Sequence, residues 1–76
     1  MTATEKLKEK LRRGGRLSCQ EVRKLLRELG FALARQKGSH EQWIRAGRTF
    51  TLACHGKDAP HYILDALRRL LEEFDE

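Results

Sequence analysis

Residues 31–54 read FALARQKGSHEQWIRAGRTFTLAC, and this stretch decides the fold. Apolar and polar residues alternate along it, which is typical of β-strands, and two short turn signals interrupt it at Gly38-Ser39 and Ala46-Gly47. Turns this short join antiparallel neighbours. We therefore expect a three-stranded antiparallel meander that buries one face and leaves the other wet.

The second and third strands of this meander are expected at residues 40–45 and 48–54. The third has the best alternation, with one face formed by Phe50, Leu52 and Cys54. In the second, Trp43 and Ile44 have opposite parity, so one of them must face away from the core. A tryptophan on the outer face could stack on a base or pack on a partner.

A helix is predicted on each side of the meander. Ser18 and Glu21 have the spacing of a capping box, and an apolar stripe of helical period follows up to Leu29, with Gly30 as the expected terminating residue. The last helix begins near Pro60, with Asp58 as the expected cap. Its apolar face is the broadest in the chain and contains Ile63, Leu64, Leu67, Leu70, Leu71 and Phe74. The predicted class is α+β, with both helices on one face of the sheet.

The first sixteen residues form a separate prediction. Thr4 can cap a short helix that runs to Arg13, but Leu7 and Leu11 are a small apolar face for a helix of this length. We expect residues 1–16 to be a helical extension, docked or partly mobile, and residues 17–76 to be the main domain.

Charge is distributed unevenly along the 76 residues, which carry a net charge of +5. Residues 1–64 hold 14 basic and 6 acidic side chains, a net of +8, whereas residues 65–76 hold 2 basic and 5 acidic, a net of −3. A basic body favours a polyanionic partner, with nucleic acid as the first candidate, and we expect the acidic tail to lie clear of it. A chain this short excludes a two-domain cofactor enzyme.

No apolar run is long enough to cross a membrane, and the first fifteen residues lack the apolar core of a secretory signal. We expect a cytoplasmic protein without a membrane partner. Cys19 and Cys54 could form one disulfide, but in that compartment reduced thiols are expected. Cys54, His55 and His61 lack the spacing of a zinc site, so no metal and no organic cofactor is expected.

Groups that could carry chemistry gather in residues 33–40. Arg35 and Lys37 alternate along a strand and so share a face, and His40 follows the turn. A neutral imidazole could take the proton of a ribose 2′-hydroxyl, and a cation could stabilise the charge on the attacked phosphate. The plainer alternative is a surface turn histidine beside solvated cations. His55 and Lys57, in the loop after the third strand, have the same two interpretations: proton donor and phosphate contact, or exposed loop residues.

The motif Arg35-x-Lys37-Gly38-Ser39-His40, preceded by Gly30-Phe31 and followed by Trp43, resembles the HicA (YcfA-like) toxins of bacterial toxin–antitoxin systems, over about residues 18–71. The resemblance implies a fold like the double-stranded RNA-binding domain, an mRNA-cleaving activity, a HicB-like antitoxin as partner, and a catalytic histidine at His40. Two departures are Glu41-Gln42 after the histidine, which places a negative charge near the phosphate path, and Ala53 where a proline is frequent.

We therefore expect the toxin component of a toxin–antitoxin system, a metal-independent endoribonuclease that uses one histidine, His40, as general acid/base on mRNA. The expected RNA contacts are Arg35, Lys37, Gly38, Ser39 and Lys57. The first alternative is a non-catalytic RNA-binding module of the same fold. A DNA-binding helix-turn-helix ranks last, because it needs a second helix soon after Gly30, where strands are predicted.

Overall fold

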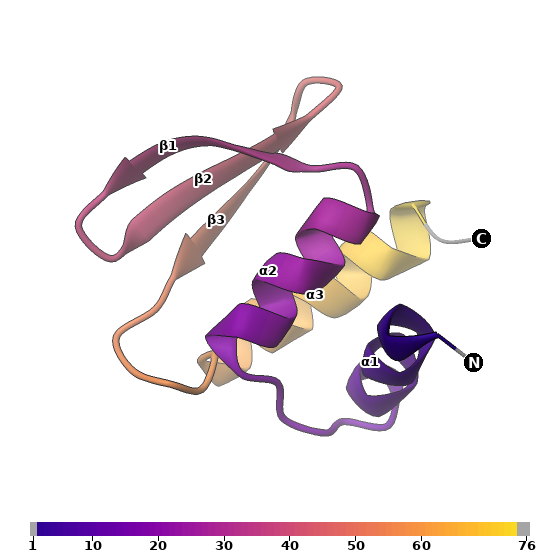
Figure 1. The fold of residues 1–76 in the computed structure, drawn as a ribbon. Coiled ribbons are helices and arrows are strands. Elements are labelled where there is room, and N and C mark those ends of the chain that lie inside the picture. Colours follow the sequence, from indigo (N-terminus) through magenta and orange to yellow (C-terminus); the bar gives the residue numbers. More distant parts are fainter. Residues whose placement is uncertain (1, 75–76) are drawn as a thin grey trace.

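The computed structural model describes residues 2–74, in the order helix, helix, three strands, helix (Figure 1). The elements are α1 (Ala3–Arg12), α2 (Cys19–Glu28), β1 (Ala32–Lys37), β2 (His40–Arg45), β3 (Arg48–Ala53) and α3 (His61–Phe74). This is an α+β fold with an open three-stranded antiparallel sheet, and from α2 onward it has the predicted α-β-β-β-α order. None of the helices described in this range is long and apolar enough to span a membrane.

The sheet is the predicted meander, with β2 in the middle. Its second turn is tight because Ala46 and Gly47 both adopt positive φ angles, 46° and 82°, the combination that matches the twist of a two-residue hairpin. The pairing of β1 with β2 has an irregularity between Leu33 and Arg35, after which the register is regular up to the Lys37–His40 pair.

One face of the sheet packs on α2 and α3 and forms the core (Figure 1). Trp43 is 1% exposed and belongs to this core, whereas Ile44 is 38% exposed on the other face. Of the two residues, Ile44 is therefore the one that faces away from the core. The prediction that Trp43 could stack on a base from the outer face is wrong. The side chain of Arg27 lies over its ring at 5.3 Å from the centroid.

Local sequence explains both ends of α2. Ser18 and Glu21 form the predicted capping box, in which each side chain accepts a hydrogen bond from the other residue's backbone N–H. Gly30 follows the helix with a φ of 91°, a conformation that favours glycine. A side chain here would also approach the guanidinium of Arg45, which donates a 2.8 Å hydrogen bond to the carbonyl of Leu29.

Helix α1 belongs to the same core as the rest of the chain. Leu11 and Leu17 are fully buried, and Arg68 on α3 donates a 2.8 Å hydrogen bond to the carbonyl of Leu11. The cap of α1 is Thr2, not Thr4 as expected, because the Thr2 hydroxyl accepts the hydrogen bond from the N–H of Glu5. The extension is therefore docked.

Helix α3 begins next to Pro60, as predicted, but the expected cap at Asp58 differs. The carbonyl of Pro60 accepts the first hydrogen bonds, from the N–H groups of Ile63 and Leu64. Asp58 lies earlier in the loop, where it forms an isolated bridge with Ser18. The entry to α3 is thus tied to the residue that caps α2.

Candidate active site

The open face of the sheet carries a hollow of about 400 Å³, lined by Arg35, Lys37, His40, Gln42 and Thr51. Strand register explains this set: Lys37 pairs with His40, Arg35 pairs with Gln42, and Gln42 pairs with Thr51. Residues paired across neighbouring strands point to the same face. Three of the predicted site residues, Arg35, Lys37 and His40, are therefore brought together on one solvent-exposed surface.

Gln42 and Thr51 were not singled out from the sequence. The signal that could have found them is strand parity, because Gln42 stands two residues after His40 and Thr51 lies directly opposite it in β3. Both side chains offer hydrogen-bond donors and acceptors without charge. Gln42 lies directly opposite Arg35, and Thr51 continues the hollow onto β3.

The turn that leads into His40 is formed by Gly38 and Ser39. Gly38 has a φ of 61°, in the left-handed region, and a Cβ there would meet no atom within 4 Å, so backbone conformation explains the glycine better than crowding does. The carbonyl of Ser39 accepts a 3.2 Å hydrogen bond from the N–H of Cys54. Their backbone thus stands at the rim of the hollow and joins it to the exit of β3.

A second histidine lies beside His40. The ring of His55 has its centroid 6.3 Å from that of His40, and the two ring planes make an angle of 74°. The register accounts for this neighbour, because His40 pairs with Ala53 and the chain then needs only two more residues to reach His55. Both imidazoles belong to exposed residues.

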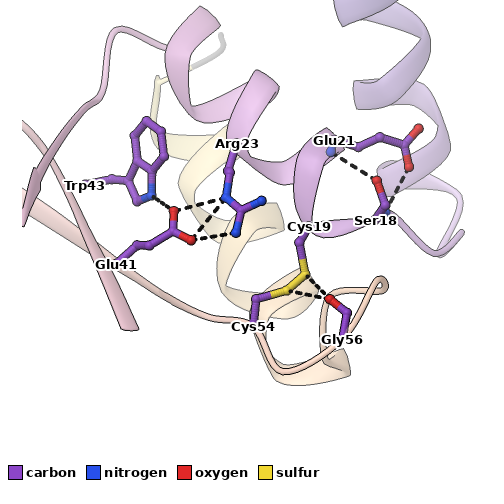
Figure 2. The surroundings of a disulfide bond; sticks show 8 residues. All are labelled: Ser18, Cys19, Glu21, Arg23, Glu41, Trp43, Cys54 and Gly56. Atoms are coloured by element: carbon purple, nitrogen blue, oxygen red, sulfur yellow. Dashed lines mark hydrogen bonds and ion pairs between the residues drawn. A yellow bond between two sulfur atoms is a disulfide. The ribbon is translucent and has the colours of Figure 1, made fainter. Parts of the chain in front are cut away.

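The loop that carries His55 is tied to the start of α2. A disulfide joins Cys19 to Cys54, with their Cα atoms 6.5 Å apart (Figure 2). The N–H of Cys19 also donates a 2.8 Å hydrogen bond to the carbonyl of Lys57, and the N–H of Ala59 donates to Leu17. The structure thus pairs the two cysteines that were expected as reduced thiols, and it can do so because the exit of β3 lies directly against the first turn of α2.

Lys57 stands apart from the other predicted phosphate ligands. Its carbonyl is bound to α2 as described, its residue is exposed, and it does not line the hollow. It shares the loop of His55. Lys57 is thus positioned at the margin of the candidate site.

Glu41 does not place its charge in the hollow. Its side chain is buried on the helix side of the sheet, where it accepts hydrogen bonds from the Arg23 guanidinium, at 2.6 and 3.1 Å, and from the indole N–H of Trp43, at 3.1 Å (Figure 2). The bonds from Arg23 hold the pKa of Glu41 below its ordinary value, and Glu41 in turn raises the pKa of Arg23. The expectation that Glu41 places a negative charge near the phosphate path is therefore wrong.

Cations dominate the hollow. Arg35 and Lys37 supply two positive charges, and no carboxylate lines it. Within residues 2–74, no group of three or more His, Cys, Asp or Glu side chains is arranged to hold a metal ion. The arrangement suits an anionic ligand that lies across an open sheet beside an imidazole.

The chain was also compared with known protein families, curated proteins and solved structures. The family model for the HicA toxin of bacterial toxin–antitoxin systems matches residues 19–73, from the first residue of α2 almost to the end of α3. No curated protein and no solved structure matches the chain. The chain belongs to the HicA toxin family, and it is the toxin component of a toxin–antitoxin system, the kind of toxin that pairs with an antitoxin.

Proposed function

We propose that this toxin is a metal-independent endoribonuclease that cleaves mRNA in the cytoplasm, with His40 as its general base. The observation that carries the proposal is the hollow on the open sheet face, which gathers an exposed imidazole with the side chains of Arg35 and Lys37. The proposal is also supported by membership of the HicA toxin family, because the resemblance to these toxins implies an mRNA-cleaving activity.

The chemistry follows from the groups present. Neutral His40 takes the proton of a ribose 2′-hydroxyl, and the oxygen attacks the adjacent phosphorus. Arg35 and Lys37 hold the phosphate and stabilise the negative charge that develops on its oxygens. The turn backbone at Gly38 and Ser39 and the side chain of Lys57 are proposed as further phosphate contacts. DNA lacks the attacking hydroxyl and would not be cleaved.

An RNA cleavage assay in EDTA tests this proposal. Wild-type toxin, His40→Ala and His61→Ala are compared on one RNA and on the same sequence with 2′-deoxyribose throughout. His61 is a matched control because it is an exposed histidine that pairs with Asp65 on α3 and does not line the hollow. Cleavage of RNA alone by the wild type and His61→Ala, and its loss in His40→Ala, supports the proposal.

The same assay decides between an enzyme and a non-catalytic RNA-binding module. A binding module would give intact RNA with every variant, and His40→Ala would bind RNA as tightly as the wild type. It would also prefer duplexes, because a fold of this kind can recognise duplex RNA by shape. Those results together would replace the proposed nuclease with the binding module.

We also propose how the antitoxin neutralises the toxin. A HicB-like partner with an acidic contact surface would cover the hollow or the edge of β1, whose six residues are all exposed. Adding the antitoxin to saturation should then abolish RNA binding. Full cleavage activity in the saturated complex would contradict this geometry.

A further inference from the structure

We infer that His55 is a second catalytic residue, the general acid that protonates the leaving 5′-oxygen of the cleaved RNA; this inference rests on the proposed nuclease activity. In the proposed reaction the bond from the 2′-oxygen to phosphorus forms and the bond from phosphorus to the 5′-oxygen breaks. The first event releases a proton and the second requires one. A single imidazole on the 2′-oxygen side leaves the departing oxygen without a donor.

The distance between the rings of His40 and His55 is compatible with one acting as general base and the other as general acid on the same phosphate. In an in-line displacement, the entering and leaving oxygens lie on opposite sides of phosphorus. With a hydrogen bond of about 2.6–3.2 Å at each end, the two acting nitrogens lie within roughly 10 Å of each other. The ring centroids of His40 and His55 are 6.3 Å apart and the rings are not stacked, so one phosphate can be reached from both.

The position of His55 is held by its neighbours on both sides. Cys54, before it, is bonded to Cys19 through the disulfide, and its N–H donates to the carbonyl of Ser39 in the turn that precedes His40. Lys57, two residues after it, accepts the N–H of Cys19. The segment is therefore fixed to both α2 and the His40 turn. A loop held in this way can keep an imidazole at a constant place beside the phosphate.

The proton balance closes with these two groups. His40 begins neutral and ends as imidazolium after it has taken the 2′-hydroxyl proton. His55 begins as imidazolium and ends neutral after it has given its proton to the 5′-oxygen. The products are a 2′,3′-cyclic phosphate and a 5′-hydroxyl, and exchange of protons with water restores both histidines.

The test uses an RNA that the wild-type toxin cleaves and the same RNA with a 5′-bridging sulfur at the cleaved bond. A thiolate leaves without protonation, so a variant that lacks only the general acid recovers on the sulfur substrate. On ordinary RNA we expect His55→Ala and His55→Asn to cleave about 10²–10⁴-fold more slowly than the wild type, the usual contribution of one acid/base group. On the sulfur substrate we expect both to come within tenfold of the wild type.

Three comparisons make the outcome specific. His40→Ala should remain impaired on both substrates, and His61→Ala should match the wild type on both. A melting temperature of His55→Asn equal to that of the wild type separates a catalytic loss from unfolding.

Cleavage by His55→Ala and His55→Asn at the wild-type rate, or a loss that sulfur does not relieve, would overturn the inference while leaving the nuclease in place. If sulfur rescued His40→Ala instead, the assigned roles would be wrong. If the wild-type toxin cleaved no RNA at all, the proposed function would fail together with the inference.

Discussion

The carboxylate of Glu41 lies 2.6 Å from the guanidinium of Arg23, on the face of the sheet opposite His40. The two residues that follow the turn thus have separate tasks. His40 faces solvent in the hollow, while Glu41 ties the central strand to α2 and receives the indole N–H of Trp43. Because consecutive residues of a strand point to opposite faces, His40 lies at the candidate site and Glu41 lies in the interior.

Glu41→Gln should therefore lower stability without lowering cleavage. Hydrogen bonds to a buried charged group are worth about 1.5–3 kcal/mol, and we expect a loss of this size in the free energy of unfolding at pH 7. Urea unfolding measures it, with Glu28→Gln, a substitution of an exposed glutamate on α2, as the control. Reduced RNA cleavage by a folded Glu41→Gln protein would contradict the assignment of Glu41 to the interior.

The same pair predicts how stability depends on pH. Arg23 lowers the pKa of Glu41 in the folded chain relative to the unfolded value of about 4.3. The pair therefore stabilises the fold above that value, and its contribution is lost as the pH falls through the lower folded pKa. The stability difference between wild type and Glu41→Gln should shrink between pH 7 and pH 3. An equal difference at the two pH values would count against the ion pair.

Helix α1 should be needed for full stability although the family match begins only at residue 19. Leu11 is fully buried, so Leu11→Ala should lower the free energy of unfolding by about 2–5 kcal/mol. Lys6→Ala, on the exposed side of the same helix, is the control and should change little. Equal melting temperatures for the two variants would show that α1 is not part of the core.

Reduction of the disulfide should loosen the loop of His55. The bond closes a loop with a sequence separation of 35 residues, and disulfides of this kind contribute about 2–4 kcal/mol to stability. Thermal unfolding with and without a dithiol reductant measures the loss, and Cys19→Ser with Cys54→Ser should unfold like the reduced wild type. Titration of two free thiols in untreated, denatured protein would contradict the bond itself.

Arg35 and Lys37 should contribute to RNA binding by contacting the phosphates of the RNA. Arg35→Ala and Lys37→Ala should each weaken RNA binding and reduce the slope of log affinity against log salt by about 0.7, the value for one contact to a single strand. Lys24→Ala, an exposed lysine on the helical layer, should leave the slope unchanged. Identical slopes for all four proteins would remove the two cations from the RNA path.

Much of this fold could be predicted from the sequence because its signals are local. The capping box at Ser18, Gly30 after α2 and the alternation in β2 and β3 all depend on residues close in the chain. The helix cap of α1 was misplaced because Thr2 and Thr4 are both suitable and only the geometry separates them.

The candidate site was less accessible to sequence reasoning. Strand parity predicts that Arg35 and Lys37 share a face. Whether Trp43 or Ile44 points into the core depends on the packing of α2 against the sheet. The proximity of His55 to His40 depends on the register of β2 with β3, and the disulfide depends on where the exit of β3 meets α2. These are long-range relationships that no local pattern specifies.

One comparison tests most directly whether the toxin cleaves RNA by means of His40. Purified wild-type toxin and His40→Ala are incubated with the same RNA in EDTA, and the cleavage rates and product ends are measured. We predict cleavage by the wild type that leaves 5′-hydroxyl ends, and a rate lower by about 10²–10⁴-fold in a folded His40→Ala protein. Equal cleavage by the two proteins would contradict the account.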